Sequence, residues 1–350
     1  MRSFKLNPLT VKKINRFKSI KRGYYSFIIF SLSLFFAMFA EFFVNSKAIL
    51  VKYEGNYHFP TYSDVISGET FGLDYKYETN YRELNKQFES EESDNFVIMP
   101  VFPYNPLEND LQEGIYPPTA PNMDNQHFLG TDTTGRDILA RLVYGYRIAI
   151  VFSLGLLLIN YVIGITIGCL MGFYGGWFDI IVQRIIEIWS NIPFLYVVII
   201  VSSIVVPSLG VLMGIMAFFG WMGMTWYMRT KTYKEKEREY VLAARALGAK
   251  DRKIIFSHII PNSISLIVTF IPFSIAGGMT SLTSLDYLGF GLLPPTPSWG
   301  ELLSQGTSRL DAPWIGISVV FAMILILTMI TFIGEAIREA FDPKKHTTYQ

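Results

Sequence analysis

Charged residues of both signs crowd together in the run HFLGTDTTGRDILARLVYGYR at residues 127–147. The DTTG sequence predicts a turn, and Arg136, Asp137 and Arg141 follow Asp132 at helix spacing. An aspartic-protease site would need glycine two residues after the aspartate, and a second such aspartate to share its proton. Neither requirement is met, so the cluster does not predict that chemistry.

Other catalytic motifs are missing from the sequence. The histidines, His58, His127, His258 and His346, are dispersed, and there is no HExxH or G-x-S-x-G pattern. No Gly-Lys pair occurs, so the chain has no Walker A loop to hold the phosphates of ATP. The single cysteine, Cys169, excludes an internal disulfide and a cysteine metal cluster. No metal site is predicted, and a membrane enzyme is an alternative that no motif supports.

A charged stretch, EYVLAARALGAKDRKIIFSHIIPN at residues 239–262, lies between two apolar runs and is too polar for lipid. Apolar residues recur at helical spacing on both sides of Gly248, which predicts two short helices joined by a glycine turn. Asp251 complements the dipole at the start of the second helix, and Pro261 is expected to end the unit. Small residues let another surface approach the backbone, so we expect a partner here; an amphipathic helix pair without a partner is the alternative. The candidate contact residues are Ala243, Ala244, Gly248, Ala249, Asp251 and Pro261.

The composition is that of a membrane protein. Of 350 residues, 51% are hydrophobic and 15% aromatic, and the mean hydropathy is +0.31. The net charge of +1 gives no indication of a nucleic-acid partner. We predict an all-α polytopic membrane protein with six transmembrane helices, at residues 24–44, 148–172, 192–206, 211–228, 263–285 and 314–335.

Charge asymmetry predicts the orientation of these helices. Residues 1–23 contain basic and no acidic residues, which predicts an amphipathic segment on the cytoplasmic side; the alternative, a nucleic-acid-binding arm, conflicts with the span that follows directly. Residues 24–44 form the first span, and the acid-rich segment 45–147 is expected outside, where its aromatic residues favour an ordered small domain. The helical core covers residues 148–338, with a basic cytoplasmic loop at 229–262 and a cytoplasmic tail at 339–350. Both termini are therefore predicted in the cytoplasm.

The fifth predicted span is rich in small and hydroxyl-bearing residues. Such residues serve either close helix packing or the lining of a wet path, and the sequence leaves both open. The candidate path residues are Gly277, Thr280, Ser281 and Ser284.

Three motifs resemble those of one family of transporters. Residues 239–262 are similar to the EAA loop of ATP-binding-cassette (ABC) importer permeases, although Leu242 stands where that family has glutamate, and His258 and Ile260 also depart from the pattern. Residues 127–147 resemble the LGTD-x-x-GRD-x-x-x-R-x-x-x-G-x-R signature of dipeptide and oligopeptide permeases, and residues 288–300 match their LGFG-x-x-PP-x-PSWG pattern. Residues 50–60, LVKYEGNYHFP, resemble the microcin C-type branch. The residues of the outer signature are Gly130, Asp132, Gly135, Arg136, Asp137 and Arg141.

The resemblance implies a type I ABC importer permease fold, a C-type subunit, with the 45–147 segment inserted outside the membrane between the first two helices. It implies a sister permease as heterodimer partner, one or two ABC ATPase subunits and an extracytoplasmic substrate-binding protein, in the bacterial cytoplasmic (inner) membrane. The chain itself would bind no cofactor, because ATP and Mg are used by the ATPase. The implied function is import of oligopeptides or microcin C-type compounds by alternating access. Dipeptides or nickel chelates are alternative substrates, and a membrane sensor is an alternative function.

Overall fold

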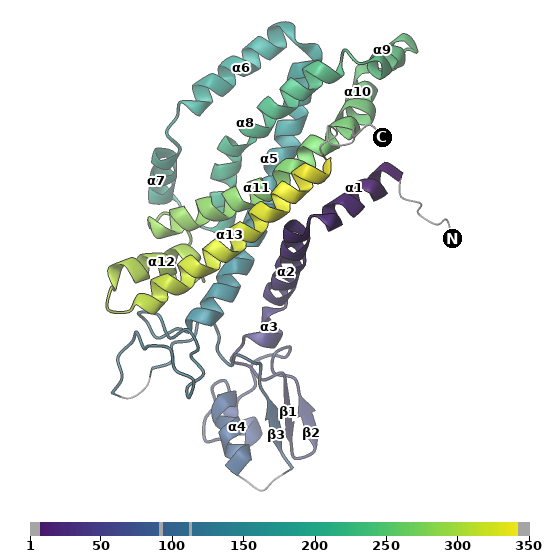
Figure 1. Ribbon diagram of the computed structural model, residues 1–350. Helices are drawn as coiled ribbons and strands as arrows, with labels where there is room; N and C mark the ends of the chain where they lie inside the picture. The colour runs from purple at the N-terminus through teal and green to yellow at the C-terminus, as the bar shows by residue number, and fades with distance from the viewer. Residues whose placement is uncertain (1–7, 91–93, 112–113, 342–350) are drawn as a thin grey trace.

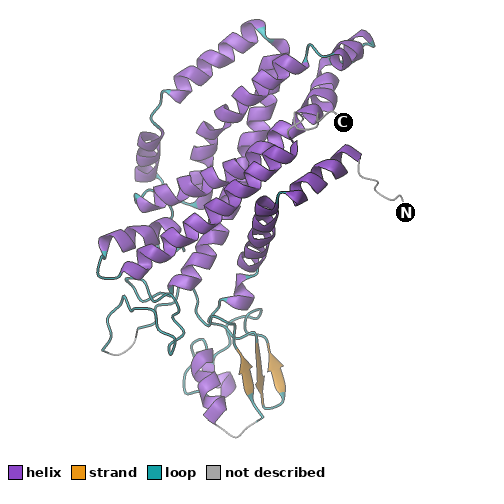
Figure 2. Cartoon of the chain, in the orientation of Figure 1, coloured by secondary structure: helices purple, strands orange, loops and turns teal. Residues whose placement is uncertain are grey.

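The structure, a computed structural model, describes residues 8–90, 94–111 and 114–341. Long helices form its body, and a small α/β unit lies at the end of this bundle opposite to α9 (Figures 1 and 2). Within the described residues, four helices are long and apolar enough to cross a membrane: α5 (Ile138–Tyr174), α8 (Leu209–Glu235), the helix Asp251–Tyr287 and α13 (Pro313–Phe341). A bent helix pair makes five if it counts as one span. The prediction of six spans therefore stays a prediction.

The N-terminal helices depart from the predicted single span at 24–44. The basic segment forms α1 (Pro8–Ser19), and α2 (Lys21–Met38) follows and packs on α13. The apolar run continues into a short helix, α3 (Ala40–Phe43). Phe39 separates α2 from α3, because its backbone (φ −108°, ψ 34°) lies outside the helical region.

The segment after α3 contains an ordered unit, as its aromatic content predicts. A three-stranded antiparallel sheet has β1 (Leu50–Tyr53) in the centre, with β2 (Asn56–His58) and β3 (Phe96–Ile98) at its sides. Helix α4 (Tyr81–Ser90) and the 3-10 turn η1 (Gly68–Phe71) complete it. Its core consists of Ala48, Val51, Phe71, Tyr81, Leu84 and Phe88. The all-α class thus applies to the bundle and not to this unit.

The segment between the second and third predicted spans is helical. That segment forms a helix, α6 (Gly176–Ser190), and the third apolar run forms only the short α7 (Phe194–Ile204). The two helices are bent by 69° at a break that contains Pro193. Proline lacks the N–H that a continuing helix needs, which explains why the chain changes direction there.

The charged stretch at 239–262 forms two short helices, as predicted. Helix α9 (Glu239–Ala246) ends at Gly248, and α10 (Asp251–Ile254) begins at Asp251. Pro261 does not end the unit: a π-helical turn, η2 (Ile255–Ile259), joins α10 directly to α11 (Ile260–Tyr287). Proline is tolerated in the first turn of a helix, and Pro261 occupies that place in α11.

The connection between α11 and α13 contains a helix, α12 (Trp299–Ser308). The close contact of α5 with α8 is made by glycines spaced four apart. A Cβ atom at Gly164, Gly168 or Gly172 would lie within 2.7 Å of a backbone oxygen of α8. These glycines let the two backbones approach closely, as small residues do in membrane helix pairs.

Candidate functional site

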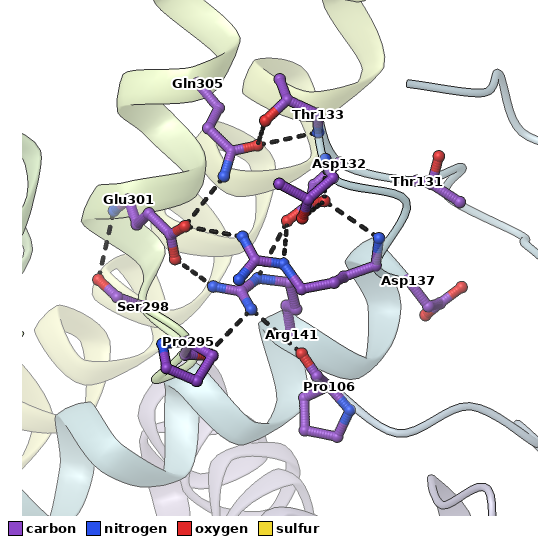
Figure 3. A network of polar contacts seen from close by, with 12 residues as sticks. Pro106, Thr131, Asp132, Thr133, Asp137, Arg141, Pro295, Ser298, Glu301 and Gln305 are labelled. Carbon is purple, nitrogen blue, oxygen red and sulfur yellow. Dashed lines mark hydrogen bonds and ion pairs between the residues drawn. The ribbon is translucent and has the colours of Figure 1, made fainter. Parts of the chain in front are cut away.

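The charged residues of the outer signature meet a partner that the sequence did not indicate. Asp132 Oδ2 lies 2.7 Å from Arg136 Nε and 3.5 Å from Arg141 Nε. Both arginines then contact Glu301 of α12: Arg136 Nη2 donates to Oε1 at 2.8 Å, and Arg141 donates to Oε2 (Figure 3). The loop before α5 is thereby joined to α12.

This network is almost closed to water. The side chains of Asp132 and Arg141 are fully buried, and Arg141 also donates to the carbonyl oxygens of Pro106 and Pro295 (Figure 3). Asp132 accepts further hydrogen bonds from the backbone and hydroxyl of Thr134, both at 2.8 Å. Burial alone would raise the pKa of Asp132, but the charge of Arg136 and these hydrogen bonds hold that pKa below its ordinary value. The carboxylate is therefore charged, and its lone pairs are occupied.

The predicted turn is present, but the helix begins later than the spacing suggested. Gly135 N donates to Asp132 O at 3.0 Å, and both Gly130 and Gly135 have positive φ. Asp137 is the N-cap of α5 and accepts from Ala140 N at 2.7 Å. All six signature residues therefore lie in or beside one folded unit, and Arg141 alone lies inside the helix.

His127 forms a second charged cluster with two carboxylates of the same loop. Its Nδ1 lies 2.8 Å from Asp137 and its Nε2 3.0 Å from Asp110, and its ring stacks on Tyr104 at 4.0 Å. Burial would lower the pKa of His127, but the hydrogen bonds and charges of the two carboxylates outweigh it and raise the pKa to about 9. The imidazole is thus doubly protonated at neutral pH and joins the two acids.

Glu301 could have been found from one sequence signal. Ser298-Trp299-Gly300-Glu301 has the S-x-x-E spacing typical of a helix start, and Ser298 Oγ does accept from the backbone N–H groups of Gly300 and Glu301. Here the Glu301 side chain turns to the arginines instead. Because every charge of this network has a charged partner, the arrangement holds two segments together and leaves no group poised for acid-base catalysis.

At the other end of the bundle, the backbone around Gly248 forms a helix-terminating motif. Gly248 has φ +78°, its N–H donates to Arg245 O at 2.9 Å, and Ala249 N donates to Ala244 O at 3.0 Å. This pair of bonds is the Schellman motif, which needs a left-handed residue at the glycine position. Ala244 and Ala249 are therefore fixed by the turn as well as being small.

The helix pair has one anchored face and one open face. Val241 of α9 and Ile254 of α10 are fully buried in a cluster shared with α5 and α8. Ala243, Gly248, Asp251 and Pro261 are exposed. Leu247 beside them is 88% exposed. An open surface of small and apolar residues on a fixed helix pair is suited to a protein partner.

Two further contacts that the sequence did not indicate hold this end in place. Glu235, at the end of α8, accepts from Lys231 and from the hydroxyl of Tyr240 on α9, each at 2.7 Å. Asp179 of α6 accepts two hydrogen bonds from Arg229 of α8 and one from Tyr233. An Arg184–Glu187 ion pair lies on the exposed face of α6. The Asp179–Arg229 ion pair ties α6 to α8, and the hydrogen bond from Tyr240 to Glu235 ties α9 to α8.

The candidate path residues lie on one face of α11. Gly277, Thr280 and Ser284 are exposed and Ser281 is half-buried. The hydroxyls of Thr280 and Ser284 donate to backbone oxygens one turn earlier, at 2.9 and 2.8 Å. A cavity of about 180 Å³ between α5, α8 and α11 is lined instead by other residues, Asn160, Tyr161 and Ser274 among them. That Gly277, Thr280, Ser281 and Ser284 line a path stays a prediction.

In the described part of the chain, no group of three His, Cys, Asp or Glu side chains is placed to hold a metal ion.

Comparison with known proteins identifies the family. Residues 164–347 match the family model "Binding-protein-dependent transport system inner membrane component". The chain is 37% identical to a peptidoglycan transport system permease protein of Agrobacterium fabrum, over 97% of this chain and 94% of that protein. It is 38% identical to an inner membrane ABC transporter permease protein of Escherichia coli, over 97% and 99%.

A third relative is more distant. The chain is 34% identical to an oligopeptide transport system permease protein of Haemophilus influenzae, over 64% of this chain and 73% of that protein. The first two relatives match along nearly their whole length, including the α/β unit, whereas the third match covers a smaller share. The chain belongs to the family of inner membrane components of binding-protein-dependent transport systems.

Proposed function

We propose that this protein is the membrane-spanning permease subunit of an ABC importer for oligopeptides or peptide-like compounds of the microcin C type. Whole-length similarity to permease proteins named for peptidoglycan and ABC transport supports this function, as does partial similarity to one named for oligopeptide transport. The observation that carries the proposal is the α9–α10 pair. It is anchored to α5 and α8 by Val241 and Ile254 and leaves its small residues open.

An ABC ATPase supplies the energy in this proposal, and it docks on the open face of α9 and α10. The continuous helix Asp251–Tyr287 begins at that face, so a displacement of α10 moves α11 directly. A sister permease completes the membrane unit, with the exposed face of α11 around Gly277 and Thr280 turned to the shared path. An extracytoplasmic binding protein delivers substrate to the α/β unit and the loop that carries Asp132.

The membrane arrangement belongs to the same proposal. The α2–α3 segment forms the first crossing and the bent α6–α7 pair the third, which gives six crossings with both termini in the cytoplasm. Basic residues of α1 and of the 229–262 loop support that orientation. The α/β unit then lies outside the inner membrane.

The test is purification of the tagged chain from its own membranes, followed by mass spectrometry of co-purified proteins and small molecules. We expect an ABC ATPase, a second permease and a peptide-like ligand, and ATP-dependent uptake of that ligand by proteoliposomes made from the complex. Recovery of a dipeptide or a nickel chelate as the transported ligand would change the substrate class and keep the transporter. A chain that purifies folded but never with an ATPase would contradict the proposed function.

A further inference from the structure

A cavity at the α10 end of the bundle combines polar groups with a largely apolar wall, as a lipid headgroup site would. It has a volume of about 270 Å³ and lies between the end of α8, the start of α11 and the end of α13. Lys231 and Arg338 line it from α8 and α13. Helix α1 packs on α13, the helix that carries Arg338 (Figure 1).

Lys13 of α1 places a second cation beside the cavity, in addition to Arg338. Its ammonium group donates to the hydroxyl of Ser265, which lines the cavity, at 3.1 Å, and lies 4.3 Å from the centre of the Phe341 ring. Ser265 therefore uses its oxygen as an acceptor, and its own proton is left to donate to a ligand. Asn262 and Thr269 also line the wall, but the Thr269 hydroxyl donates to Ser265 O at 2.7 Å and the Asn262 amide donates to His258 O at 2.9 Å, which leaves the amide one further N–H.

The carboxylates near the cavity do not cancel these charges. Glu235 pairs with Lys231 at 2.7 Å, and Glu335, one turn from Arg338, pairs with Arg22 at 3.2 Å. Among the described residues, neither Lys13 nor Arg338 forms an ion pair with an acid, although Glu339 beside Arg338 has interactions of its own. The cavity thus combines two cations from different helices with neutral hydrogen-bonding groups, which suits one phosphate.

The rest of the cavity wall is apolar, which favours a lipid over a soluble phosphate as the ligand. Leu266 and the ring of Phe341 line the cavity beside the polar groups. Polar groups next to apolar walls at the ends of membrane helices match a phospholipid, whose phosphate lies at the surface and whose chains lie deeper. Basic α1 lies at the same level and faces the anionic leaflet.

We propose that this cavity, lined by Ser265 and Arg338 and flanked by Lys13, binds the phosphodiester headgroup of an anionic phospholipid of the inner leaflet. The assignment of the leaflet rests on the proposed orientation, whereas the binding site itself does not. The lipid bridges α1, α11 and α13 and so fixes the basic helix against the helix that continues from α10.

The test is native mass spectrometry of the purified full chain, alone or with whatever subunits accompany it, after removal of lipid and addition of phosphatidylglycerol or phosphatidylcholine. We expect retention of phosphatidylglycerol over phosphatidylcholine, and a loss of roughly tenfold or more in affinity for the double variant Lys13→Gln, Arg338→Gln. Lys12→Gln removes an equal charge from the exposed neighbour of Lys13 and should keep the affinity. Arg338→Lys keeps the positive charge and should keep most of the affinity. A loss in the glutamine variant alone is then due to the lost charge and not to misfolding.

Several results would overturn the proposal. Equal retention of both lipids by the natural chain excludes a site for anionic headgroups. Unchanged binding in the double variant places the lipid elsewhere, and an equal loss in Lys12→Gln reduces the effect to the general charge of α1. Binding of glycerol 3-phosphate as tight as that of phosphatidylglycerol would make the cavity a site for soluble phosphates. Because the measurement needs neither ATP nor transport, its failure is independent of failure of the proposed function.

Discussion

At the scale of single residues, the end of the bundle that carries α12 depends on charges that cannot reach water. Arg141 is fully buried, and Glu301 is the acid that its Nη2 reaches. A buried charge that loses its partner costs far more than the pair contributes when intact. The contacts between residues 132–141 and α12 are therefore most sensitive to substitutions that remove one member.

Glu301→Ala should lower the free energy of unfolding by about 3–5 kcal/mol, because it leaves the buried guanidinium of Arg141 short of its strongest acceptor. The measurement is the unfolding midpoint of the detergent-solubilised protein, followed by tryptophan fluorescence. Asp311→Asn is the control, since it breaks the exposed pair with Arg309 and should leave the midpoint in place. Equal midpoints for Glu301→Ala and the natural protein would show that the network does not support the fold.

The stability of the loop that precedes α5 should depend on pH through His127. Its pKa in the folded chain is raised to about 9 from an ordinary value of 6.5. The stabilisation is therefore fully present below pH 6.5 and is lost as the pH rises from 6.5 through about 9. Unfolding midpoints measured between pH 6 and 9.5 should fall in this window, and His127→Gln should flatten that part of the profile.

His58→Gln is the control for this profile, because His58 lies on β2, outside the contacts with Asp110 and Asp137. It should keep the decline between pH 6.5 and 9. A decline that survives in His127→Gln would assign the pH dependence to another group.

At the scale of elements, the angle between α9 and α10 is set by one backbone conformation. Gly248→Val should cost about 1–2 kcal/mol locally, since a β-branched residue resists φ near +78°. No atom lies within 4 Å of a Cβ built there, so the change acts through the backbone and not through a clash. We expect an inserted protein with weakened ATPase association and lost uptake, measured by pull-down and transport in the same membranes.

Gly248→Asn is the matched control, because asparagine adopts the left-handed conformation more readily than other residues with side chains. It should retain most of the association and uptake. Full ATPase recovery together with normal uptake in Gly248→Val would show that this turn does not couple the permease to its ATPase.

The close packing of α5 on α8 should depend on glycine at the positions where the two backbones meet. Gly168→Ala places a Cβ 2.5 Å from Thr225 O and should cost about 1–3 kcal/mol through forced separation of the helices. Gly223→Ala adds the same methyl group to α8 where no atom lies within 4 Å, and should be tolerated. Thermal unfolding of both variants in one detergent makes the comparison; a milder effect at Gly168 than at Gly223 would refute close packing there.

Local sequence signals predicted several elements, although not α6 or α12, and long-range contacts stayed hidden. The break at Gly248 was predictable, because a glycine that ends a helical pattern acts through its immediate neighbours. The pairing of Glu301 with Arg141 was not, because the two residues lie 160 positions apart. The continuation of the helix through Pro261 was also missed: proline marks a helix start as readily as an end, and only the π-helical turn before it decides which.

At the scale of the whole molecule, the two ends of the bundle should face opposite sides of the membrane. Cys169 is buried and can be replaced by alanine, after which Tyr116→Cys and Lys236→Cys provide single thiols. Tyr116 lies in the loop before α5 and is 91% exposed. In the proposed orientation the thiol of Tyr116→Cys should therefore react with an impermeant reagent in spheroplasts. The thiol at 236 should react only after the membrane is opened. Labelling of position 236 in intact spheroplasts would reverse the proposed orientation.

The unbroken helix from Asp251 to Tyr287 has a mechanical consequence. At 1.5 Å per residue it is about 55 Å long, well beyond the ~30 Å of a hydrocarbon core, so part of it must project from the membrane. Its far end is fastened, since Asp286 accepts from the backbone of Leu292 and from Ser298, the N-cap of α12. Pro272 lies near its middle and leaves one carbonyl without a helical donor, which makes that point the easiest to bend. We therefore expect the helix to act as a hinged arm: when the α10 end is displaced, the half before Pro272 swings while the half that ends at Asp286 stays in place.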